Sequence, residues 1–390
     1  MAKTADVVVV GGGVLGASTA FFLAQQGVKR VVVLERYLPA SGATGKTAGM
    51  VRMHYSNEVV ARMALWSRDL FIHWTDRIGG PPVFHKTGWV FLCPPEHVQH
   101  FQANIAMLKR VGVDSEVITP EEVKKRVPSL SLEGVAIAEY EANSGWAEGH
   151  GTVSGFLAAA RRLGAETVMT SPVTNIRLDK GRVRAVETAR EVYETPVVVN
   201  AAGPWATHVS KMVGVDLPLE LSREEEVVFQ LPGGDNRGLI AVSDAALRIY
   251  FRPDTPGHLL VGAGHPKANQ PADPDHYRET ADTEFIEYAS GKISQRLPLT
   301  RDALLVRGYA GLYNITPDWN YLLGAVPEVP GYYLATGGSG HGFKIGPAAG
   351  LMVAEQIAGG KATSFDITPF RLSRFREGAP LKSTYGGNRG

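Results

Sequence analysis

The sequence is poor in cysteine: Cys93 is the only one among 390 residues. A single thiol builds neither an internal disulfide framework nor a cysteine-based zinc site, and it fits a reducing compartment. We therefore expect a cytoplasmic protein. No pair of histidines has metal-ligand spacing, so we expect no metal site.

Long hydrophobic runs and an excess of charge are also missing. No stretch approaches the length of a membrane span, and the opening segment, with Lys3, Asp6 and four valines before glycine, does not resemble an export signal. The 40 basic and 39 acidic residues leave a net charge of +1, which gives no reason to expect a nucleic-acid partner. Any recognition of charge must therefore be local.

Glycine is abundant, and the first glycines interrupt a regular pattern. Val7–Val10 has the length and composition of a strand buried on both faces, residues 17–26 those of a buried helix, and Val31–Leu34 those of a second strand. Together they predict a βαβ unit. Residues 196–199 and 332–335 repeat the strand pattern, so we expect these distant pieces to converge on one sheet.

The intervening segments predict a second lobe. Residues 96–111 are expected to be helical, and residues 119–122 supply an N-cap, a proline and a capping-box glutamate for another helix. Short alternating segments over residues 227–264 predict antiparallel strands. A β-hairpin is expected over residues 173–187, with its turn at residues 179–181.

The strongest local motif is G-x-G-x-x-G over residues 11–16, which follows a strand and opens a helix. Gly11 allows the tight turn, Gly13 lets the backbone approach a pyrophosphate, and Gly16 allows close packing of helix on strand. Glu35, at the end of the next strand, is placed to accept hydrogen bonds from ribose hydroxyls and disfavours a 2′-phosphate. FAD and NAD both satisfy this fingerprint, so the motif alone does not choose between them.

A second glycine cluster, residues 337–347, precedes an apolar helix expected over residues 348–357. Such a strand-to-helix turn places backbone N–H groups against a second part of an extended cofactor, such as the pyrimidine edge of a flavin. A nicotinamide enzyme does not need it. The cluster therefore favours FAD.

The fingerprint, residues 41–44, the Val197–Trp205 segment and residues 339–344 together resemble the D-amino-acid-oxidase-type flavoprotein family. The resemblance extends to about Phe375. Within the family, the sequence is most similar to the branch that contains sarcosine oxidase, dimethylglycine dehydrogenase and the L-proline dehydrogenase β subunit. It implies bound FAD, two lobes with the flavin ring between them, and oxidation of an amine to an imine that water hydrolyses.

The expected fold class is α/β with an α+β second lobe: a Rossmann-like FAD-binding domain that carries an inserted antiparallel-sheet substrate domain. We expect the FAD-binding domain over residues 1–82, 141–214 and 323–376, and the substrate domain over residues 83–140 and 215–322. A flexible tail is expected over residues 377–390.

The resemblance also suggests site residues. Arg52 and Lys344 match the pair that holds the substrate carboxylate in sarcosine-oxidising members, and Tyr250 and Tyr313 match aromatic positions of the pocket, where plain core packing is an equal alternative. The expected cofactor-binding residues lie in or beside the matching motifs: Gly11, Gly13, Val14, Leu15, Gly16, Glu35, Arg36, Ser41, Ala43, Thr44, Lys46, Gly49, Met50, Val173, Ala202, Gly203, Trp205, Gly338, Gly340, His341, Gly342, Phe343 and Lys344.

Three positions depart from the family pattern. Lys46 stands where some members carry a flavin-linking histidine, and Gly311 where others carry a flavin-linking cysteine, so we expect noncovalent FAD. Leu260 takes the place of the lysine that activates oxygen in the oxidases. Without that charge superoxide loses electrostatic help, which favours an electron acceptor other than oxygen.

The expected function is FAD-dependent oxidation of a small secondary or N-methylated amino acid, of the sarcosine, dimethylglycine or proline type, with electrons passed to oxygen or another acceptor. The alternatives are a primary D-amino-acid or glycine oxidoreductase, and a flavin-carrying β subunit of a hetero-oligomeric dehydrogenase. The expected partners are a small amino-acid or amine substrate and further subunits, identical or different.

Overall fold

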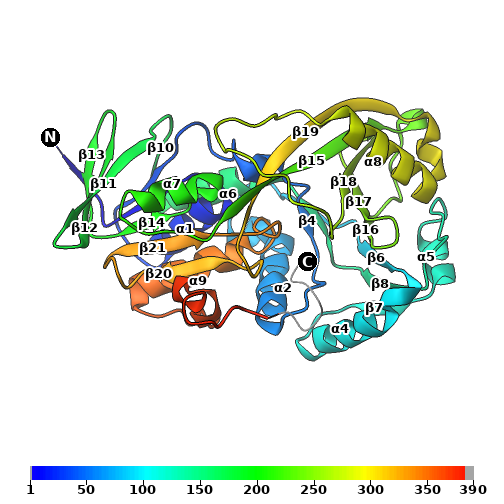
Figure 1. Cartoon of the computed structure of the whole chain (residues 1–390), viewed down its shortest axis with the longest axis horizontal. Coiled ribbons are helices and arrows are strands. Elements are labelled where there is room, and N and C mark those ends of the chain that lie inside the picture. Colours follow the sequence, from blue (N-terminus) through cyan, green and yellow to red (C-terminus); the bar gives the residue numbers. More distant parts are fainter. Residues whose placement is uncertain (1, 383–390) are drawn as a thin grey trace.

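The computed structural model describes residues 2–382, and two large sheets dominate it (Figure 1). The first has six strands in the order β10-β3-β2-β14-β21-β20. Its strands are β2 (Val7–Val10), β3 (Val31–Leu34), β10 (Glu166–Val168), β14 (Val198–Asn200), β20 (Leu322–Ala325) and β21 (Tyr332–Thr336). All neighbours are parallel except β20 and β21. Because β14 lies between β2 and β21, the predicted convergence of distant pieces on one sheet is confirmed.

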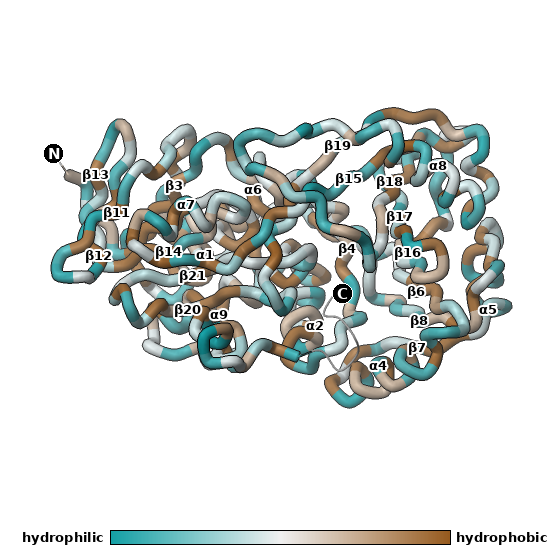
Figure 2. Tube along the Cα trace, in the orientation of Figure 1, coloured by the Kyte–Doolittle hydropathy of each residue, from teal (hydrophilic) through white to brown (hydrophobic). Residues whose placement is uncertain are grey.

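This sheet is covered on both faces, as its continuous hydrophobic strands require. One core contains α1 (Val14–Gln25), α2 (Glu58–Ile72), α6 (Gly149–Arg162) and α9 (Gly346–Gly359). The other contains α7 (Ala206–Lys211) and a small sheet of β1 (Lys3–Thr4), β11 (Val173–Asp179), β12 (Arg182–Thr188) and β13 (Val192–Glu194). Figure 2 shows the hydrophobic trace gathered where these strands and helices meet.

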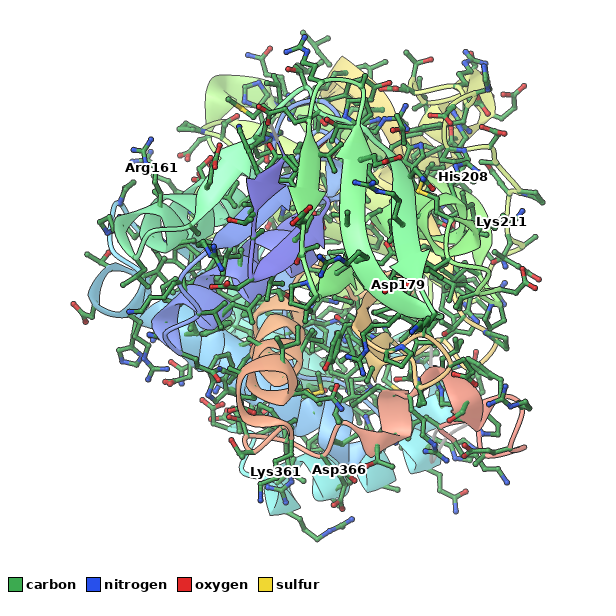
Figure 3. All side chains as sticks on the ribbon, turned by 90° about the vertical axis from the view of Figure 1, so that its left-hand side faces the viewer. Arg161, Asp179, His208, Lys211, Lys361 and Asp366 are labelled. Carbon is green, nitrogen blue, oxygen red and sulfur yellow. The ribbon has the colours of Figure 1, made fainter. Side chains whose placement is uncertain are left out.

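The predicted hairpin is confirmed by the antiparallel pair β11 and β12. Its turn uses Lys180 and Gly181, both with positive φ (47° and 79°), as a two-residue hairpin connection needs. Figure 3 shows this hairpin in front of the six-stranded sheet, with Asp179 at its turn.

Glycines bring the two glycine-rich turns together. A Cβ on Gly346, at the start of α9, would lie 2.9 Å from Val14, at the start of α1, and one on Gly350 would lie 2.2 Å from Ser18. The Ser18 hydroxyl also donates to the Gly346 carbonyl at 3.1 Å. The N-termini of α1 and α9 are therefore neighbours although 332 residues separate Val14 from Gly346 along the chain.

The second sheet has eight strands in the order β19-β15-β18-β17-β16-β6-β8-β7. They are β6 (Trp89–Cys93), β7 (Glu116–Ile118), β8 (Ile137–Glu141), β15 (Glu220–Gln230), β16 (Ala241–Asp244), β17 (Ile249–Pro253), β18 (His258–Ala263) and β19 (Leu304–Ile315). The predicted antiparallel sheet needs one correction, because β16 pairs with β6 in parallel. The two strands come from separate insertions, so no hairpin dictates their direction.

The two faces of this sheet differ. Directly paired residues share a face, and one row across the sheet contains Tyr309, Glu226, Gly262, Tyr250, Ser243, Phe91 and Glu139. The next row, on the opposite face, contains Val227, Val261, Phe251, Val242 and Val90, which belong to a hydrophobic core. The apolar face thus packs within its own lobe and the polar face is turned toward the rest of the molecule.

The remaining elements complete the lobes. Helices α4 (Val98–Arg110), α5 (Pro120–Arg126) and α8 (Thr283–Arg296) accompany the second sheet, and α5 has the predicted capping box between Thr119 and Glu122. The short helix α3 (Trp74–Arg77) follows α2, and a three-stranded sheet joins β4 (Met50–Val51), β9 (Gly145–Ala147) and β5 (Phe84–His85). No helix within residues 2–382 is long and apolar enough to cross a membrane.

The proposed domain boundaries remain a prediction. Every strand of the two large sheets lies within a single predicted domain, except that Glu141 at the end of β8 and Leu322 at the start of β20 each lie one residue across a boundary. The flexible tail over residues 377–390 also remains a prediction. Within residues 377–382, the Leu381 N–H donates to Asp318 at 2.9 Å and the Glu377 carboxylate pairs with Arg371. Residues 383–390 lie outside the described part of the chain.

Candidate active site

A cavity of about 870 Å³ lies between the six-stranded sheet and the polar face of the eight-stranded sheet. Its lining includes every predicted site residue except Gly16 and His341. Gly16 lies beneath the lining, where a Cβ would meet the Gly11 carbonyl oxygen at 1.9 Å. Its role is the predicted one of letting α1 pack closely on β2.

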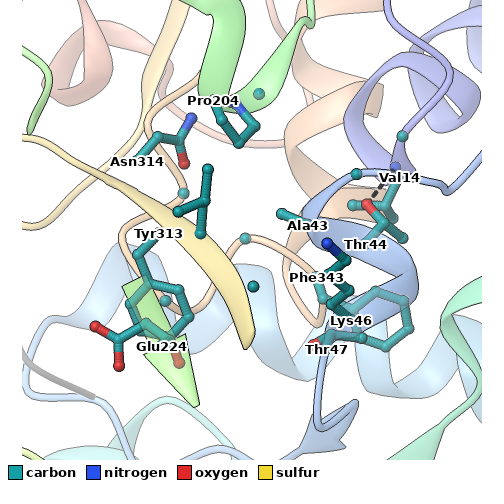
Figure 4. Close-up of a pocket in the computed structure, with 18 of the residues that line it drawn as sticks. Val14, Ala43, Thr44, Lys46, Thr47, Pro204, Glu224, Tyr313, Asn314 and Phe343 are labelled. Carbon is teal, nitrogen blue, oxygen red and sulfur yellow. Dashed lines mark hydrogen bonds between the residues drawn. The ribbon is translucent and has the colours of Figure 1, made fainter. Parts of the chain in front are cut away.

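One end of the cavity has the features of a dinucleotide site. Gly11 has φ of 108°, and a Cβ there would lie 2.5 Å from the Ala201 carbonyl oxygen, so only glycine fits this turn. Helix α1 begins after Gly13 without a side-chain cap and without an acidic residue in its first turn. An uncapped helix N-terminus that opens into a cavity is suited to a phosphate. Thr44 supports the turn by accepting the Val14 N–H at 3.1 Å (Figure 4).

Glu35 lies at the same end and is 8% exposed. Its carboxylate accepts the N–H groups of Gly12 (2.7 Å) and Tyr37 (2.8 Å). These bonds fix the carboxylate beside the glycine turn, at the end of β3 where the ribose was expected. The residues present therefore fit the ADP half of FAD.

The second glycine turn forms another wall. Gly340 has φ of 84°, and a Cβ there would lie 2.5 Å from the ring of Tyr313, so the turn and the ring are in direct contact. Lys344 and Phe343 follow and line the cavity. His341 is the exception: its ring lies against Tyr55 and Tyr321, and the hydroxyl of Tyr321 donates to its carbonyl oxygen at 3.0 Å. Burial lowers the pKa of His341 to about 3, so it supports the turn as a neutral ring.

Two cations lie buried at the far end of the cavity. Arg52 and Lys344 are each 8% exposed, and among the described residues neither forms an ion pair with a carboxylate. Both cations lie over the ring of Tyr55, whose centroid is 5.2 Å from the Arg52 guanidinium carbon and 5.6 Å from Lys344 Nζ. Burial, and then the charge of Arg52, lower the pKa of Lys344 well below its ordinary value. Buried cations without a counter-ion are costly, so this end of the cavity is suited to an anion.

Arg52 is held in place by a buried network that the sequence did not reveal. Its Nη1 donates to the His54 carbonyl oxygen at 2.7 Å. The His54 ring lines the cavity, and its Nδ1 lies 2.5 Å from the fully buried carboxylate of Glu139. Glu141, two residues along the strand, accepts the Met53 N–H at 3.0 Å. Burial and the neighbouring Glu139 raise the pKa of Glu141 to about 8.

The opposite wall is acidic. Glu226 accepts the Tyr250 hydroxyl at 3.0 Å and that of Tyr309, while Glu224 pairs with Lys267 and also lines the cavity (Figure 4). Tyr313 lies within electrostatic range of both Glu224 and Arg52. The cavity therefore has a cationic end and an acidic wall, with Tyr313 between them.

The structure also places the three positions that depart from the family pattern. Lys46 lines the cavity next to Gly311, where a Cβ would lie 3.2 Å from the Lys46 Cβ. Its amino group pairs with Glu279 at 2.8 Å, so its charge is partly balanced. Leu260 is buried in β18 and is not among the described residues that line the cavity. Among the described lining residues the lysines and arginines are Arg36, Lys46, Arg52 and Lys344.

The lining residues that sequence reasoning missed include five from the eight-stranded sheet, Trp89, Phe91, Glu224, Glu226 and Asn314, and also His54, which follows β4. The signal for Glu224 and Glu226 was a run of three glutamates directly before the strand region predicted over residues 227–264. The structure places this run inside β15, and a strand is an unusual place for acids. The others carry no local signal, since aromatic residues in strands are ordinary core.

Comparison with known proteins decides what this cavity belongs to. The family model described as DAO, FAD dependent oxidoreductase, matches residues 6–356. The chain belongs to this family. The FAD cofactor, the expected family and the α/β fold class with a Rossmann-like FAD-binding domain are thereby confirmed.

Individual relatives agree with this assignment. The chain is 29% identical to the mitochondrial sarcosine dehydrogenase of Homo sapiens, over 96% of this chain but 42% of that protein, so it spans less than half of that relative's length. It is 25% identical to sarcosine oxidase subunit beta of Rhodobacter capsulatus, over 96% of this chain and 90% of that protein. The crystal structure of L-proline dehydrogenase from P. horikoshii superposes with a TM-score of 0.90 at 30% identity, covering 98% of this chain and 100% of that one.

Proposed function

We propose that this oxidoreductase oxidises a small secondary or N-methylated amino acid. The observation that carries the proposal is the pair of buried cations, Arg52 and Lys344, which have no carboxylate partner among the described residues. An arginine fork and a lysine point charge together suit the carboxylate of an amino acid. The names of the relatives, sarcosine dehydrogenase and L-proline dehydrogenase, support this substrate class.

The acidic wall supports a defined orientation. With the carboxylate on Arg52 and Lys344, the amine points toward Tyr313, Tyr250 and Glu226, where negative charge favours a nitrogen that becomes cationic as it is oxidised. The aromatic rings of Trp89 and Phe91 line the cavity beside them and suit a methyl group or a pyrrolidine ring.

The Rossmann-like lobe and the second glycine turn hold the cofactor in this proposal, with FAD bound noncovalently. When bound, FAD supplies the acceptor for the hydrogen and electron pair that leave the substrate's C–N unit. The protein's own residues position the substrate and keep water away from it, and the imine that forms is hydrolysed by water after release. No strong protein base is required, because the free-base amine has no proton to lose before oxidation.

The decisive experiment is an anaerobic panel of sarcosine, dimethylglycine, L-proline, glycine and D-alanine, read by bleaching of the flavin band. We expect at least one N-substituted amino acid to reduce the flavin. Bleaching only by glycine or D-alanine supports the primary-amine alternative instead. Failure of every amine, together with copurification of another chain, supports the β-subunit alternative, which the likeness to a sarcosine oxidase subunit beta favours.

Admission of air after reduction then tests the electron acceptor. We expect slow reoxidation, because the charge of Lys46 is balanced by Glu279 and the other lining cations near the substrate, Arg52 and Lys344, are engaged by its carboxylate. Reoxidation within the time of mixing contradicts this expectation and identifies an oxidase.

Arg52→Ala tests the clamp. Removal of one of two charged contacts to a carboxylate is expected to raise KM about a hundredfold and to leave flavin content near that of the wild type. Loss of the flavin in this variant contradicts the assignment of Arg52 to the substrate.

A further inference from the structure

A segment of the substrate lobe crosses to the cofactor lobe. Residues 270–280, here called the strap, lie between β18 and α8 (Figure 1). Arg223 of β15, which is 8% exposed, anchors both ends. Its N–H donates to the Gln270 carbonyl oxygen at 2.8 Å, and its guanidinium donates to the carbonyl oxygens of Arg278 (2.8 Å) and Thr280 (2.6 Å). The ends of the strap are thus fixed to the eight-stranded sheet.

The middle of the strap is tied to the other lobe. Asp275 Oδ1 accepts from Arg36 Nη1 at 2.9 Å and from Trp205 Nε1 at 2.8 Å. The Arg36 guanidinium in turn lies over the rings of Tyr37 and Trp205, at 4.7 and 4.9 Å from their centroids. Arg36 follows β3 and Trp205 follows β14, so one carboxylate of the substrate lobe holds two loops of the cofactor lobe.

A second tie lies a few residues along the strap. Lys46 Nζ donates to the Tyr277 hydroxyl at 2.5 Å and to Glu279 at 2.8 Å. Lys46 belongs to the cofactor lobe, in the segment that follows Ser41. Both ties therefore connect the strap, which belongs to the substrate lobe, to the cofactor lobe.

The strap also forms part of the cavity wall. Pro274, Asp275, Tyr277 and Glu279 line the same cavity as Gly11 and the other residues of the fingerprint. A molecule bound against the fingerprint lies under a segment that is fixed at both ends and tied at two points in its middle. While the ties hold, the strap closes this part of the cavity wall.

We propose that the strap is a latch of the cofactor cavity, in which Asp275, tied to Arg36 and Trp205, together with Tyr277 and Glu279, tied to Lys46, sets how fast FAD enters and leaves. The proposal rests on the placement of FAD given above. The ties join protein to protein and need no ligand, so opening them precedes both entry and exit. A latch of this kind changes the two rates together and leaves the equilibrium affinity almost unchanged.

The test measures FAD exchange in the full-length protein without any substrate. Flavin fluorescence reports binding of FAD to the apoprotein and release of FAD after dilution. For Asp275→Ala we expect both rates to rise about three- to tenfold, a modest factor because the Asp275–Arg36 pair is about one-third exposed. Asp275→Asn retains an acceptor for Trp205 and is expected to give a smaller rise in both rates. Adding Tyr277→Phe to Asp275→Asn removes a contact of Lys46 and is expected to raise both rates further.

Asp273→Asn is the matched control, since Asp273 accepts the Asp275 N–H within the strap and pairs with His276, and forms no hydrogen bond or ion pair with the described residues of the cofactor lobe. Rates in Asp275→Ala equal to those of this control overturn the latch. A rise in the release rate alone, with an equal loss of affinity, also overturns it and makes Asp275 a direct contact of FAD. Because the assay contains no substrate, a failed amine panel leaves this result intact, whereas absence of FAD binding in the wild type refutes the cofactor placement itself.

Discussion

The six-stranded sheet is buried on both faces, whereas the eight-stranded sheet is apolar on one face and turns polar side chains toward the cavity on the other. The first sheet meets the cavity through glycine turns, where backbone N–H groups are the proposed binding groups. The second meets it through carboxylates and phenols. We therefore expect substitutions in the two sheets to act differently. A new Cβ in a glycine turn of the first sheet displaces backbone, whereas a changed side chain on the cavity face of the second sheet alters the charge in the cavity.

The largest effect is expected where a Cβ has no room. Gly16→Ala places a methyl group 1.9 Å from the Gly11 carbonyl oxygen, and backbone on both sides must move. We expect loss of bound flavin and a destabilisation of about 2–4 kcal/mol. Absorbance of the purified protein and thermal unfolding measure both.

Gly12→Ala is the control for that prediction. The three atoms nearest to its Cβ would belong to the Glu35 side chain, at 3.1–3.2 Å, and a side chain yields more readily than backbone. We expect a smaller loss of flavin than in Gly16→Ala, because Glu35, the expected partner of the ribose, has to shift by only a few tenths of an ångström. An equal loss of flavin in both variants removes the distinction between backbone and side-chain crowding in this turn.

The next effect concerns the charge of Lys344. Its pKa is lowered by burial and by Arg52, so raising the pH removes its proton and the affinity for a carboxylate falls. Lys344→Met is expected to raise KM about thirty- to a hundredfold and to remove this pH dependence. The inhibition constant of acetate, measured over the whole range from pH 5.5 to the ordinary lysine value of 10.5, checks both.

Lys361→Met, at an exposed lysine labelled in Figure 3, is the matched control and is expected to retain the wild-type profile. A wild-type inhibition constant that is independent of pH, or a pH dependence that persists in Lys344→Met, contradicts the assignment of that proton to Lys344.

A further effect is expected on stability. The pKa of Glu141 is raised to about 8, so the folded protein keeps a proton that the unfolded chain releases above the ordinary value near 4.5. This contribution to stability is therefore full below pH 4.5 and is lost as the pH rises through about 8, by on the order of 4 kcal/mol. Glu141→Gln is expected to abolish this decline in urea titrations between pH 5 and 8. The exposed Glu287→Gln should keep it, and a decline equally steep in both variants assigns the proton elsewhere.

The smallest effect is expected for Glu139, which acts through His54 on Arg52. Glu139→Gln keeps the shape but removes the charge beside the ring, and we expect KM to rise about three- to tenfold with kcat and flavin content retained. Steady-state kinetics over a range of pH measure the split. Glu116→Gln, at an exposed glutamate of the same sheet, is the control. A fall in kcat with unchanged KM identifies a role other than positioning.

Much of the cofactor lobe could be read from the sequence. Val7–Val10 and Val31–Leu34 form the predicted strands with the same bounds. A strand that is buried on both faces has a continuous run of apolar residues, which is visible in the sequence alone. Glycine turns are equally local, since Gly11 is required by a backbone angle and a contact next to it. The resemblance placed Arg52 and Lys344, and the structure brings them to a shared ring, Tyr55, that no pattern indicated.

The sequence by itself determined the elements whose causes lie within a few residues: the βαβ unit, the capped helix after Thr119, the hairpin turn at Lys180 and Gly181, and the fingerprint. Only the tertiary structure decided which distant side chains meet. Glu139 beside His54, and Asp275 between Arg36 and Trp205, depend on the register of the eight-stranded sheet and on how the strap crosses between lobes. Such pairings follow from long-range packing. The local sequence is the same for a buried glutamate that binds a half-buried histidine as for a glutamate that faces solvent.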